Sequence, residues 1–289
     1  MKITEMLKNN RQMLSFEVFP PKTETSFQSV SQAALEVAAL NPDFISITYG
    51  AGGGTSRYTI QLASEIRKAT GVEPLAHLTC VSSTHETVAR QIQLIHDAGI
   101  ENVMALRGDI PEGGEAGTYH HASELIRELR ASGYDFCIGG ACYPEVHPES
   151  CDQKADIAGL KMKADAGCDF LTTQMFFDNH LLFNFLYKIR EAGITIPVFP
   201  GIMPITSRRQ VQQVMRLSNA SLPQRFKSLM DRYGDSEAAM CQAGIIYATD
   251  QLIDLFANGI QVVHVYTMNK PHVAAAIQKN LTGIVGMPV

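Results

Sequence analysis

Short apolar runs alternate with stretches of helical periodicity along the whole chain. In the helical stretches, apolar residues recur three or four positions apart, as in Tyr58, Leu62 and Ile66. The runs between them are almost wholly apolar, as is typical of parallel strands that are buried on both faces. We predict eight such strands, over 14–19, 44–48, 75–79, 103–106, 136–143, 170–174, 196–200 and 262–266.

A glycine follows most of the helical stretches, shortly before the next apolar run. Glycine takes the left-handed conformation that ends helices without the steric cost that a Cβ brings. These glycines are Gly71, Gly99, Gly133, Gly167, Gly193 and Gly259. Eight strands that alternate with helices predict an α/β fold, the (β/α)8 TIM barrel, with a doubly wound sheet as the structural alternative. The long gap before the last glycine predicts extra helical material, roughly 208–256, between strands seven and eight.

Composition narrows the class of protein. The 289 residues include 24 Lys and Arg against 29 Asp and Glu, and 45% of them are apolar. A mildly acidic chain without basic blocks suits neither nucleic acid nor a membrane surface as a partner. No apolar run approaches the roughly 18 residues of a membrane span, and the first residues lack a signal-peptide pattern. We therefore expect a cytoplasmic protein, folded as one domain over 1–289 because no Pro- or Ser-rich linker interrupts the chain.

The cysteines and histidines argue against a metal site. The six cysteines are scattered and form no CxxC pair, so they fit neither a disulfide framework nor a zinc site. At the predicted strand ends, the only near-cluster of histidine and acidic residues is the segment 143–149, YPEVHPE, where two prolines favour an extended loop. The alternative is that this loop binds a metal ion, but we expect no metal site in the protein.

Polar residues lie at the carboxyl ends of the predicted strands, where TIM barrels bind their ligands. They are Glu17, Thr48, His77, Arg107, Asp109, Tyr143, Gln174 and Tyr266. Such a polar ring is costly inside a core unless a ligand occupies the mouth of the barrel, so it predicts a ligand site. No strand ends in a lysine, which counts against a Schiff-base aldolase.

Glu17 lies within an otherwise apolar strand, in SFEVFPP. Burial disfavours the charged form of a carboxyl group, which suits a general acid. An ion pair with Arg107 across the barrel is the alternative. The glycine-rich segment 50–55, GAGGGT, matches neither the Rossmann nor the Walker pattern. It is either a flexible turn or backbone that approaches a flat or phosphorylated ligand.

The strand ends together resemble the 5,10-methylenetetrahydrofolate reductase family. The similar segments are SFEVFPP at 15–21, SITYGA at 46–51, AHLTC at 76–80, ALRGD at 105–109, YPEVHPE at 143–149, TQ at 173–174, PGIMP at 200–204 and VYTMN at 265–269. They occur in order and with matching spacing between about 13 and 285. The length resembles that of bacterial members, which consist of the catalytic barrel alone.

The resemblance implies an oxidoreductase that binds FAD at the mouth of the barrel. It implies the reduction of 5,10-methylenetetrahydrofolate to 5-methyltetrahydrofolate with NAD(P)H by a ping-pong scheme, a step of one-carbon metabolism and methionine synthesis. The resemblance also implies a homo-oligomer. It does not exclude a partner protein as the electron donor in place of NAD(P)H. Another flavin-dependent barrel, such as an amine or proline dehydrogenase, and a non-catalytic ligand-binding barrel are the alternatives.

The resemblance also assigns residues to roles. Glu17 matches the general acid, and Asp109 matches the carboxylate beside the flavin. The substrate contacts match Glu17, Gln174, Gln210, Tyr266 and Lys270. The FAD contacts match Thr48, Tyr49, Ala51, His77, Arg107, Gly108, Asp109, His121, Ala122, Ala141, Tyr143, His147, Asp156, Gly159, Met162 and Lys163.

Some of these positions depart from the family pattern. His121, Gly159 and Met162 stand where other members can carry tyrosine, a polar residue and a basic residue. Asp156 and Lys163 lie seven positions apart, so a helix would place them on one face, suited to a ribose and a phosphate.

Overall fold

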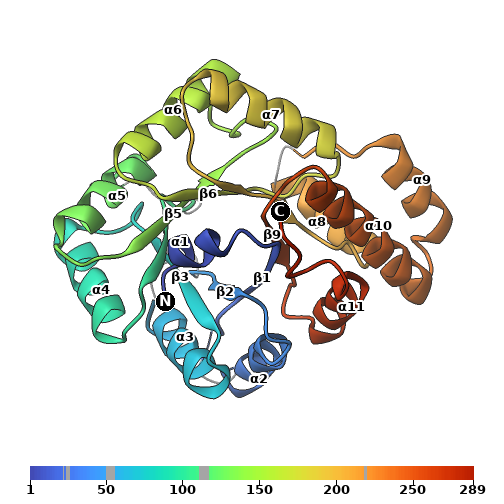
Figure 1. The fold of residues 1–289 in the computed structure, drawn as a ribbon, viewed down its shortest axis with the longest axis horizontal. Helices are drawn as coiled ribbons and strands as arrows, with labels where there is room; N and C mark the ends of the chain where they lie inside the picture. The colour runs from blue at the N-terminus through green and yellow to red at the C-terminus, as the bar shows by residue number, and fades with distance from the viewer. Residues whose placement is uncertain (22, 24–26, 50–55, 111–116, 218–219) are drawn as a thin grey trace.

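Parallel strands form a barrel that is surrounded by helices (Figure 1). The structure is a computed structural model, and it describes all residues except 22, 24–26, 50–55, 111–116 and 218–219. The strands are β1 (Met13–Val18), β2 (Phe44–Ile47), β3 (Glu73–Thr79), β4 (Asn102–Leu106), β5 (Cys137–Cys142), β6 (Phe170–Thr173), β7 (Val198–Phe199), β8 (Gly201–Ile202) and β9 (Val262–Tyr266). Their order in the sheet is β7-β6-β5-β4-β3-β2-β1-β9-β8. The predicted α/β TIM barrel is confirmed.

The seventh strand of the barrel is divided at Pro200. β7 pairs with β6, whereas β8 pairs with β9, so the two short pieces close the barrel between them. Proline has no N–H to donate to a sheet, but the Pro200 carbonyl accepts from the His264 N–H at 2.8 Å. The single strand predicted over 196–200 is therefore wrong, because the chain changes its pairing partner at this proline.

The helices follow the strands as the sequence pattern predicts. They are α1 (Ile3–Met6), α2 (Phe27–Ala38), α3 (Ser56–Thr70), α4 (His85–Asp97), α5 (Ala122–Ala131), α6 (Gln153–Asp165), α7 (Asn179–Glu191), α8 (Arg208–Leu217), α9 (Gln224–Tyr233), α10 (Glu237–Ala257) and α11 (Pro271–Leu281), with a short 3-10 turn, η1, at Leu7–Asn9. The six glycines predicted to end helices all have φ between 71° and 102°. The extra helical material predicted over roughly 208–256 consists of α8, α9 and α10, and α8 and α9 are the two helices added before the long α10.

The interior of the barrel changes from apolar to polar along its axis. Its lower layer consists of Met13, Phe44, Leu75, Met104, Cys137, Phe170, Phe199 and Val262, against which Ile3 and Met6 of α1 pack. Because side chains alternate along a strand, the next inward-facing residues lie two positions further on. On four strands these are Ser15, Ser46, His77 and His264, all of them buried. The polar layer therefore lies towards the carboxyl ends of the strands.

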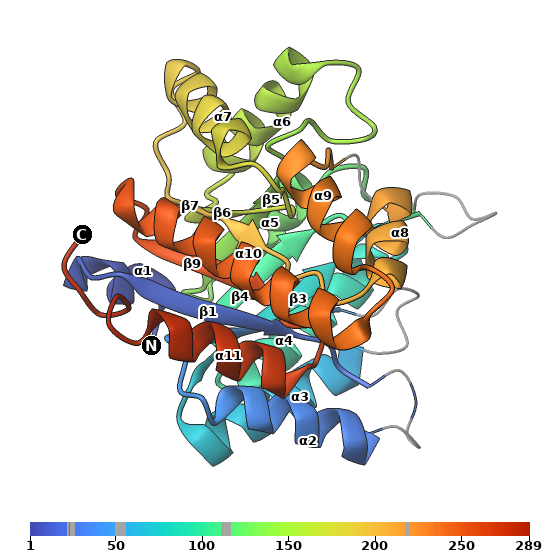
Figure 2. The same ribbon diagram turned by 90° about the vertical axis from the view of Figure 1, so that its right-hand side faces the viewer.

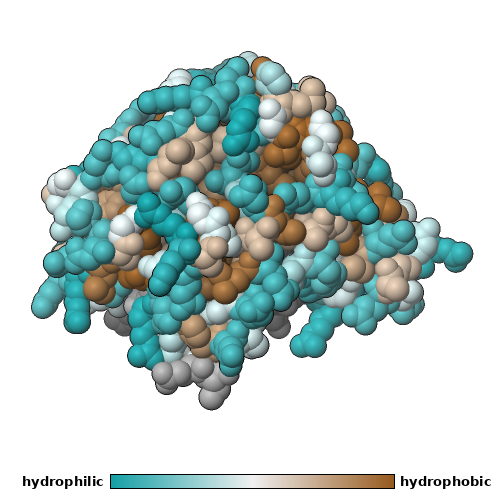
Figure 3. Space-filling model, turned by 60° about the horizontal axis from the view of Figure 1, so that its bottom comes forward, coloured by the Kyte–Doolittle hydropathy of each residue, from teal (hydrophilic) through white to brown (hydrophobic). Residues whose placement is uncertain are grey.

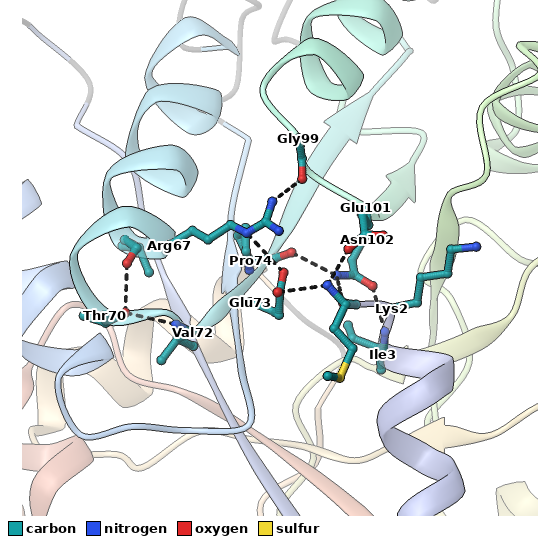
Figure 4. A network of polar contacts seen from close by, with 12 residues as sticks. Lys2, Ile3, Arg67, Thr70, Val72, Glu73, Pro74, Gly99, Glu101 and Asn102 are labelled. Carbon is teal, nitrogen blue, oxygen red and sulfur yellow. Dashed lines mark hydrogen bonds and ion pairs between the residues drawn. The ribbon is translucent and has the colours of Figure 1, made fainter.

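Polar contacts hold α1 across the amino end of the barrel (Figure 4). The side chain of Asn102 accepts from the Ile3 N–H at 2.8 Å and donates to the Met1 carbonyl at 3.1 Å. Glu73 lies 2.9 Å from the Met1 amine and 3.6 Å from Nε of Arg67. Both chain termini lie at this end, and α8 lies towards the opposite end (Figure 2).

The extra helices pack on α10 through a separate apolar cluster. It consists of Phe177, Ile205, Val211, Val214, Ala220, Phe226, Met240 and Tyr247. The approach is closest at Gly244, where a Cβ would lie 1.7 Å from the Ile205 carbonyl oxygen. A glycine is thus required for the segment before α8 to lie against α10, which places Gln210 of α8 at the mouth side of the barrel.

The surface is predominantly hydrophilic on the face drawn in Figure 3, where apolar side chains lie in separate patches. Among the described residues, no helix is both long enough and apolar enough to cross a membrane.

Candidate active site

Glu17 faces two histidines near the carboxyl end of β1. Its side chain is buried, with 8% of the residue exposed. Oε2 lies 3.4 Å from Nε2 of His264 and 3.6 Å from Nε2 of His77. The same nitrogen of His77 lies 2.6 Å from Ser46 Oγ, and Nδ1 of His264 lies 2.8 Å from Ser15 Oγ. β1, β2, β3 and β9 thus converge on one buried carboxyl group.

Arg107, which follows β4, pairs with Glu149 instead of Glu17. Its Nη1 and Nη2 donate to the two carboxylate oxygens of Glu149 at 2.5 and 2.6 Å. This bidentate geometry fixes the guanidinium plane, and it directs the Arg107 side chain towards the loop after β5. The alternative of an ion pair between Glu17 and Arg107 is therefore wrong.

A cavity of about 260 Å³ opens beside these strand ends. It is lined by Asp109, residues 143–149, Gln174, Met175 and Ala220. Four of the predicted site residues thus share one cavity. The ring of Tyr143 lies edge-on to His147, with 4.5 Å between ring centroids. Burial raises the pKa of Tyr143 to about 12 and lowers the pKa of His147, so both side chains are neutral at pH 7.

The loop that lines this cavity is strained and is tied to the extra helices. Val146 has φ of 71°, a value that β-branched residues rarely adopt. The neighbouring Glu145 carboxylate accepts from the N–H and the hydroxyl of Ser221 at 2.9 and 2.5 Å. The segment that leads into α9 therefore fixes one wall of the cavity.

Asp156 and Lys163 of α6 support the same wall, as their spacing predicts. Asp156 Oδ2 accepts from the His147 N–H at 3.3 Å, and Lys163 Nζ donates to the Ala141 carbonyl at 2.6 Å. Burial lowers the pKa of the Lys163 ammonium and raises the pKa of Asp156. In the described part of the chain, no carboxylate lies within ion-pair distance of Lys163 Nζ. A cation held in this way suits an anionic ligand.

Tyr266, at the end of β9, reaches across the mouth to β6. Its hydroxyl donates to the Thr173 carbonyl at 2.5 Å, and burial raises its pKa well above the ordinary value. Gln174 is the next residue after Thr173, and its Oε1 accepts from the Met175 N–H at 2.9 Å. These two predicted substrate contacts therefore lie on neighbouring positions of the mouth.

Lys270 and Gln210 meet at Thr206. Lys270 Nζ donates to Thr206 Oγ1 at 2.7 Å, and Gln210 Oε1 accepts from the Thr206 N–H at 3.0 Å. Thr206 lies between β8 and α8, so these two predicted contacts are held together on the segment that leads to the extra helices.

Three predicted cofactor contacts lie directly after strands. Thr48 and Tyr49 follow β2, where the Thr48 carbonyl accepts from the Thr59 hydroxyl at 2.9 Å. Gly108 follows β4 with φ of 88°, and a Cβ there would lie 3.1 Å from Cβ of Thr79. Ala51, together with the rest of 50–55, lies outside the described residues.

The positions that depart from the family pattern lie further out. His121 is exposed and precedes the first residue of α5, the buried Ala122. Met162 is 44% exposed on α6. Gly159 has no atom within 4 Å of where a Cβ would lie. None of these three residues is among the described residues that line the cavity.

His264 and the two serines that contact the histidines, Ser15 and Ser46, are not among the site residues predicted from the sequence. The available signal was the alternation of inward and outward residues: His264 precedes Tyr266 by two positions, and Ser15 precedes Glu17 by two. These residues face the same interior one layer deeper than the strand ends.

A larger cavity, of about 400 Å³, lies at the amino end of the barrel beside β5 and β6. Its charged side chains satisfy one another, because Lys2 pairs with Asp135 and Arg130 pairs with Asp169. The cluster around Glu17 is the better candidate for chemistry, because its carboxyl is buried without a cationic partner in ion-pair distance among the described Lys and Arg residues.

The fold and this site define a TIM barrel with a buried acid at a polar mouth. The family model described as methylenetetrahydrofolate reductase matches residues 2–282. The chain belongs to the methylenetetrahydrofolate reductase family.

Individual relatives agree with that assignment. The chain is 34% identical to 5,10-methylenetetrahydrofolate reductase of Escherichia coli, a match that covers 91% of this chain and 88% of the relative. It is 35% identical to methylenetetrahydrofolate reductase (NADH) 1 of Zea mays, with 97% of this chain and 50% of the relative covered. The chain thus spans about half the length of this plant relative.

Two solved structures share the fold at low sequence identity. One is an uncharacterized protein from Clostridium thermocellum that binds two copies of 5-methyl-5,6,7,8-tetrahydrofolic acid, with a TM-score of 0.66, 14% identity and 97% and 98% of the two chains covered. The other is oxaloacetate acetylhydrolase, with a TM-score of 0.57, 13% identity and 99% and 88% covered.

Proposed function

We propose that this chain is an FAD-dependent 5,10-methylenetetrahydrofolate reductase that takes its electrons from NAD(P)H. The observation that carries the proposal is the Glu17 carboxyl, buried at the mouth of a barrel that belongs to this family. The names of the bacterial and plant relatives support the folate substrate, and that of the Zea mays relative supports a nicotinamide donor.

The residues at the mouth fit FAD. The Lys163 ammonium, which has a carbonyl but no carboxylate as a partner among the described residues, fits a diphosphate. The buried Asp156 on the same helix fits ribose hydroxyl groups, and Tyr143 and His147 offer ring surfaces beside them. The chemistry that FAD supplies when bound is hydride transfer between the nicotinamide and the folate.

Glu17 holds the proton that the folate needs. Its Oε2 donates this proton to a ring nitrogen of the methylene bridge, which opens the five-membered ring and leaves a carbon that accepts hydride. Burial excludes competing water from the carboxyl, and the two histidines hold its orientation.

Asp109 and the neutral groups at the mouth have supporting roles. A negative charge at Asp109 opposes negative charge on a reduced ligand in the same cavity, and so favours release of hydride. Gln174 and Tyr266 orient the substrates by hydrogen bonds. The nicotinamide and the folate bind in turn at this mouth, in a ping-pong scheme.

The proposal extends to the organisation of the protein. Residues 1–289 act as one FAD-binding catalytic domain, and copies of the chain associate into a homo-oligomer. Ile246 and Ile253 of α10 support association, because they are 56% and 40% exposed and lie seven positions apart on one helix face. Sedimentation velocity of the purified protein tests this part, and a monomer at micromolar concentration contradicts it.

Glu17→Gln tests the central role. The variant is expected to bind FAD and to be reduced by NADH or NADPH, yet to lose hydride transfer to the folate by about 10²-fold or more. Glu86→Gln, at an exposed position of α4, is the matched control. Folate turnover by Glu17→Gln at the wild-type rate would remove Glu17 as the acid. Reduction of the protein by proline or another amine, but never by a folate, would favour the other flavin barrels.

A further inference from the structure

His264 lies one layer below Glu17 and has both ring nitrogens in contact with polar groups. Nε2 faces Glu17 Oε2 at 3.4 Å, and Nδ1 faces Ser15 Oγ at 2.8 Å. Ser15 Oγ also donates to the Val263 carbonyl at 3.2 Å. We propose that His264 is a positioning residue that holds the carboxyl group of Glu17 in its protonated form, an inference that rests on the proposed role of Glu17 as the acid.

We assign the direction of this hydrogen-bond chain from the Val263 carbonyl. A backbone carbonyl can only accept, and in this assignment the single proton of the Ser15 hydroxyl goes to Val263. Ser15 Oγ then accepts from an N–H at Nδ1 of His264. A neutral imidazole that is protonated at Nδ1 has a lone pair at Nε2, and that lone pair needs a donor. The donor within reach is the carboxylic acid form of Glu17.

Among the described residues, the side chain of His264 has polar contacts with Glu17 and Ser15 alone. The residue is 2% exposed, its ring stacks on Phe44 at 6.5 Å between centroids, and the edge of Tyr266 lies at 5.2 Å. The apolar lower layer of the barrel therefore closes the side away from the mouth. A ring nitrogen left without a partner at this depth is destabilising, because it loses its hydrogen bonds to water and gains none from the protein.

Two further titratable groups among the described residues, His77 and Tyr266, face Glu17 and are neutral at pH 7. Burial lowers the pKa of His77 to about 4, and burial raises the pKa of Tyr266 well above its ordinary value. His77 Nε2 lies closer to Ser46 Oγ, at 2.6 Å, than to Glu17, at 3.6 Å. His264 is thus the partner best placed to favour one protonation state of the carboxyl.

The proton balance of a turnover is simple. Glu17 Oε2 gives its proton to a nitrogen of the folate and becomes a carboxylate, which regains a proton from solvent at the mouth. His264 keeps its Nδ1 proton throughout, so the hydrogen bond from Nδ1 to Ser15 holds the ring in place for the next proton to arrive.

Nitrogen NMR of histidine-labelled protein tests the assignment of the proton. We expect the Nδ1–H tautomer of His264 at neutral pH, with the resonance identified by its loss in His264→Gln and its shift in Glu17→Gln. An Nε2–H tautomer, or a doubly protonated ring, overturns the inference. The spectrum is recorded on the protein with and without FAD and needs no turnover, so this result is independent of whether the chain reduces a folate.

Two amide variants separate positioning from packing. In His264→Gln the side-chain amide reaches the position of Nε2 and can still accept from Glu17. In His264→Asn it reaches only the position of Nδ1 and keeps the Ser15 contact. We expect the alkaline limb of the pH profile for the folate half-reaction to move down by about one pH unit in His264→Asn, a ten-fold loss of rate at a fixed pH above the limb.

His264→Gln is expected to stay close to the wild-type profile, and reduction by the nicotinamide is expected to be unchanged in both variants. If the Asn and Gln variants have the same pH profile for the folate half-reaction, His264 contributes packing alone and the inference is wrong. If neither variant folds, the tautomer of the wild-type protein still decides the question.

Discussion

The side chain of Tyr266 occupies the space that a side chain at position 201 would need. A Cβ on Gly201 would lie 2.5 Å from the Tyr266 hydroxyl oxygen and 2.5 Å from the Thr173 carbonyl oxygen to which that hydroxyl donates. Gly201 begins β8, directly after the proline that divides the seventh strand. The break in that strand and the reach of Tyr266 across the mouth therefore depend on the same residue.

Gly201→Ala is expected to displace Tyr266. The added methyl group has no room, so we expect a loss of about 1–3 kcal/mol in the free energy of unfolding. We also expect a higher KM for the folate, because Tyr266 can no longer reach its position. Urea unfolding and steady-state kinetics measure the two effects. Gly283→Ala, where a Cβ has open space, is the control. A fully stable Gly201→Ala protein with an unchanged KM argues against a role for the Tyr266 position.

Lys163→Met is expected to separate cofactor binding from stability. The ammonium group is held in a largely apolar setting by one carbonyl, so its removal changes the stability of the FAD-free protein by only about 1 kcal/mol. The affinity for FAD is expected to fall by about ten-fold or more, because a charge-assisted bond to phosphate is lost. Fluorescence titration with FAD measures the affinity.

The matched control for that variant is Lys161→Met. Lys161 lies on the same helix but forms an exposed ion pair with Asp165. Equal FAD affinities for the two methionine variants would show that Lys163 does not bind the diphosphate.

His77 makes the stability of the protein depend on pH. Burial lowers its pKa from 6.5 to about 4, so between these values the unfolded chain binds more protons than the folded one. The neutral ring therefore contributes its full stability above about pH 6.5 and loses it as the pH falls to about 4, a change of roughly 3 kcal/mol.

Urea unfolding of the wild-type protein and of His77→Gln at pH 7 and pH 4.5 isolates this contribution. The glutamine variant is expected to lose less stability on acidification than the wild type. The same loss in both proteins would mean that other groups govern the acid sensitivity.

Val146 pays a conformational cost that asparagine avoids. Its φ of 71° lies in the left-handed region, where asparagine is tolerated and β-branched residues are disfavoured. We expect Val146→Asn to raise the free energy of unfolding by about 1 kcal/mol. Val146→Ala keeps a Cβ in the same conformation, so thermal unfolding of this variant is expected to show no gain. If the Asn variant is less stable than the wild type, the packing of the Val146 side chain contributes more to stability than its backbone conformation costs.

Local patterns predicted the barrel because each element carries its own signal. Helical periodicity and the glycines that follow it, such as Gly71 and Gly99, depend only on nearby residues. The prediction of a single seventh strand is wrong because the strand is divided at Pro200, and this division depends on the neighbouring strands. The chain pairs with β6 before the proline and with β9 after it. That information is not local.

The sequence predicts the site residues at the strand ends, but not those that lie one layer deeper in the barrel. Strand ends identify the mouth, and Glu17 lies there as expected. His264 was missed because residue type does not say how deep in the barrel a side chain lies or which partner it meets. The choice of Arg107 between Glu17 and Glu149 is likewise a matter of distance, and the loop after β5 brings Glu149 closer.

An anaerobic visible spectrum of the purified protein, before and after addition of 5-methyltetrahydrofolate, tests the central claim most directly. We predict a flavin absorption band that bleaches when the folate is added, since the reverse half-reaction passes hydride to the bound flavin. A band that stays oxidised with the folate but bleaches with NADH or NADPH would contradict the folate substrate. A protein that neither contains FAD nor binds it when it is added would contradict the flavoenzyme itself.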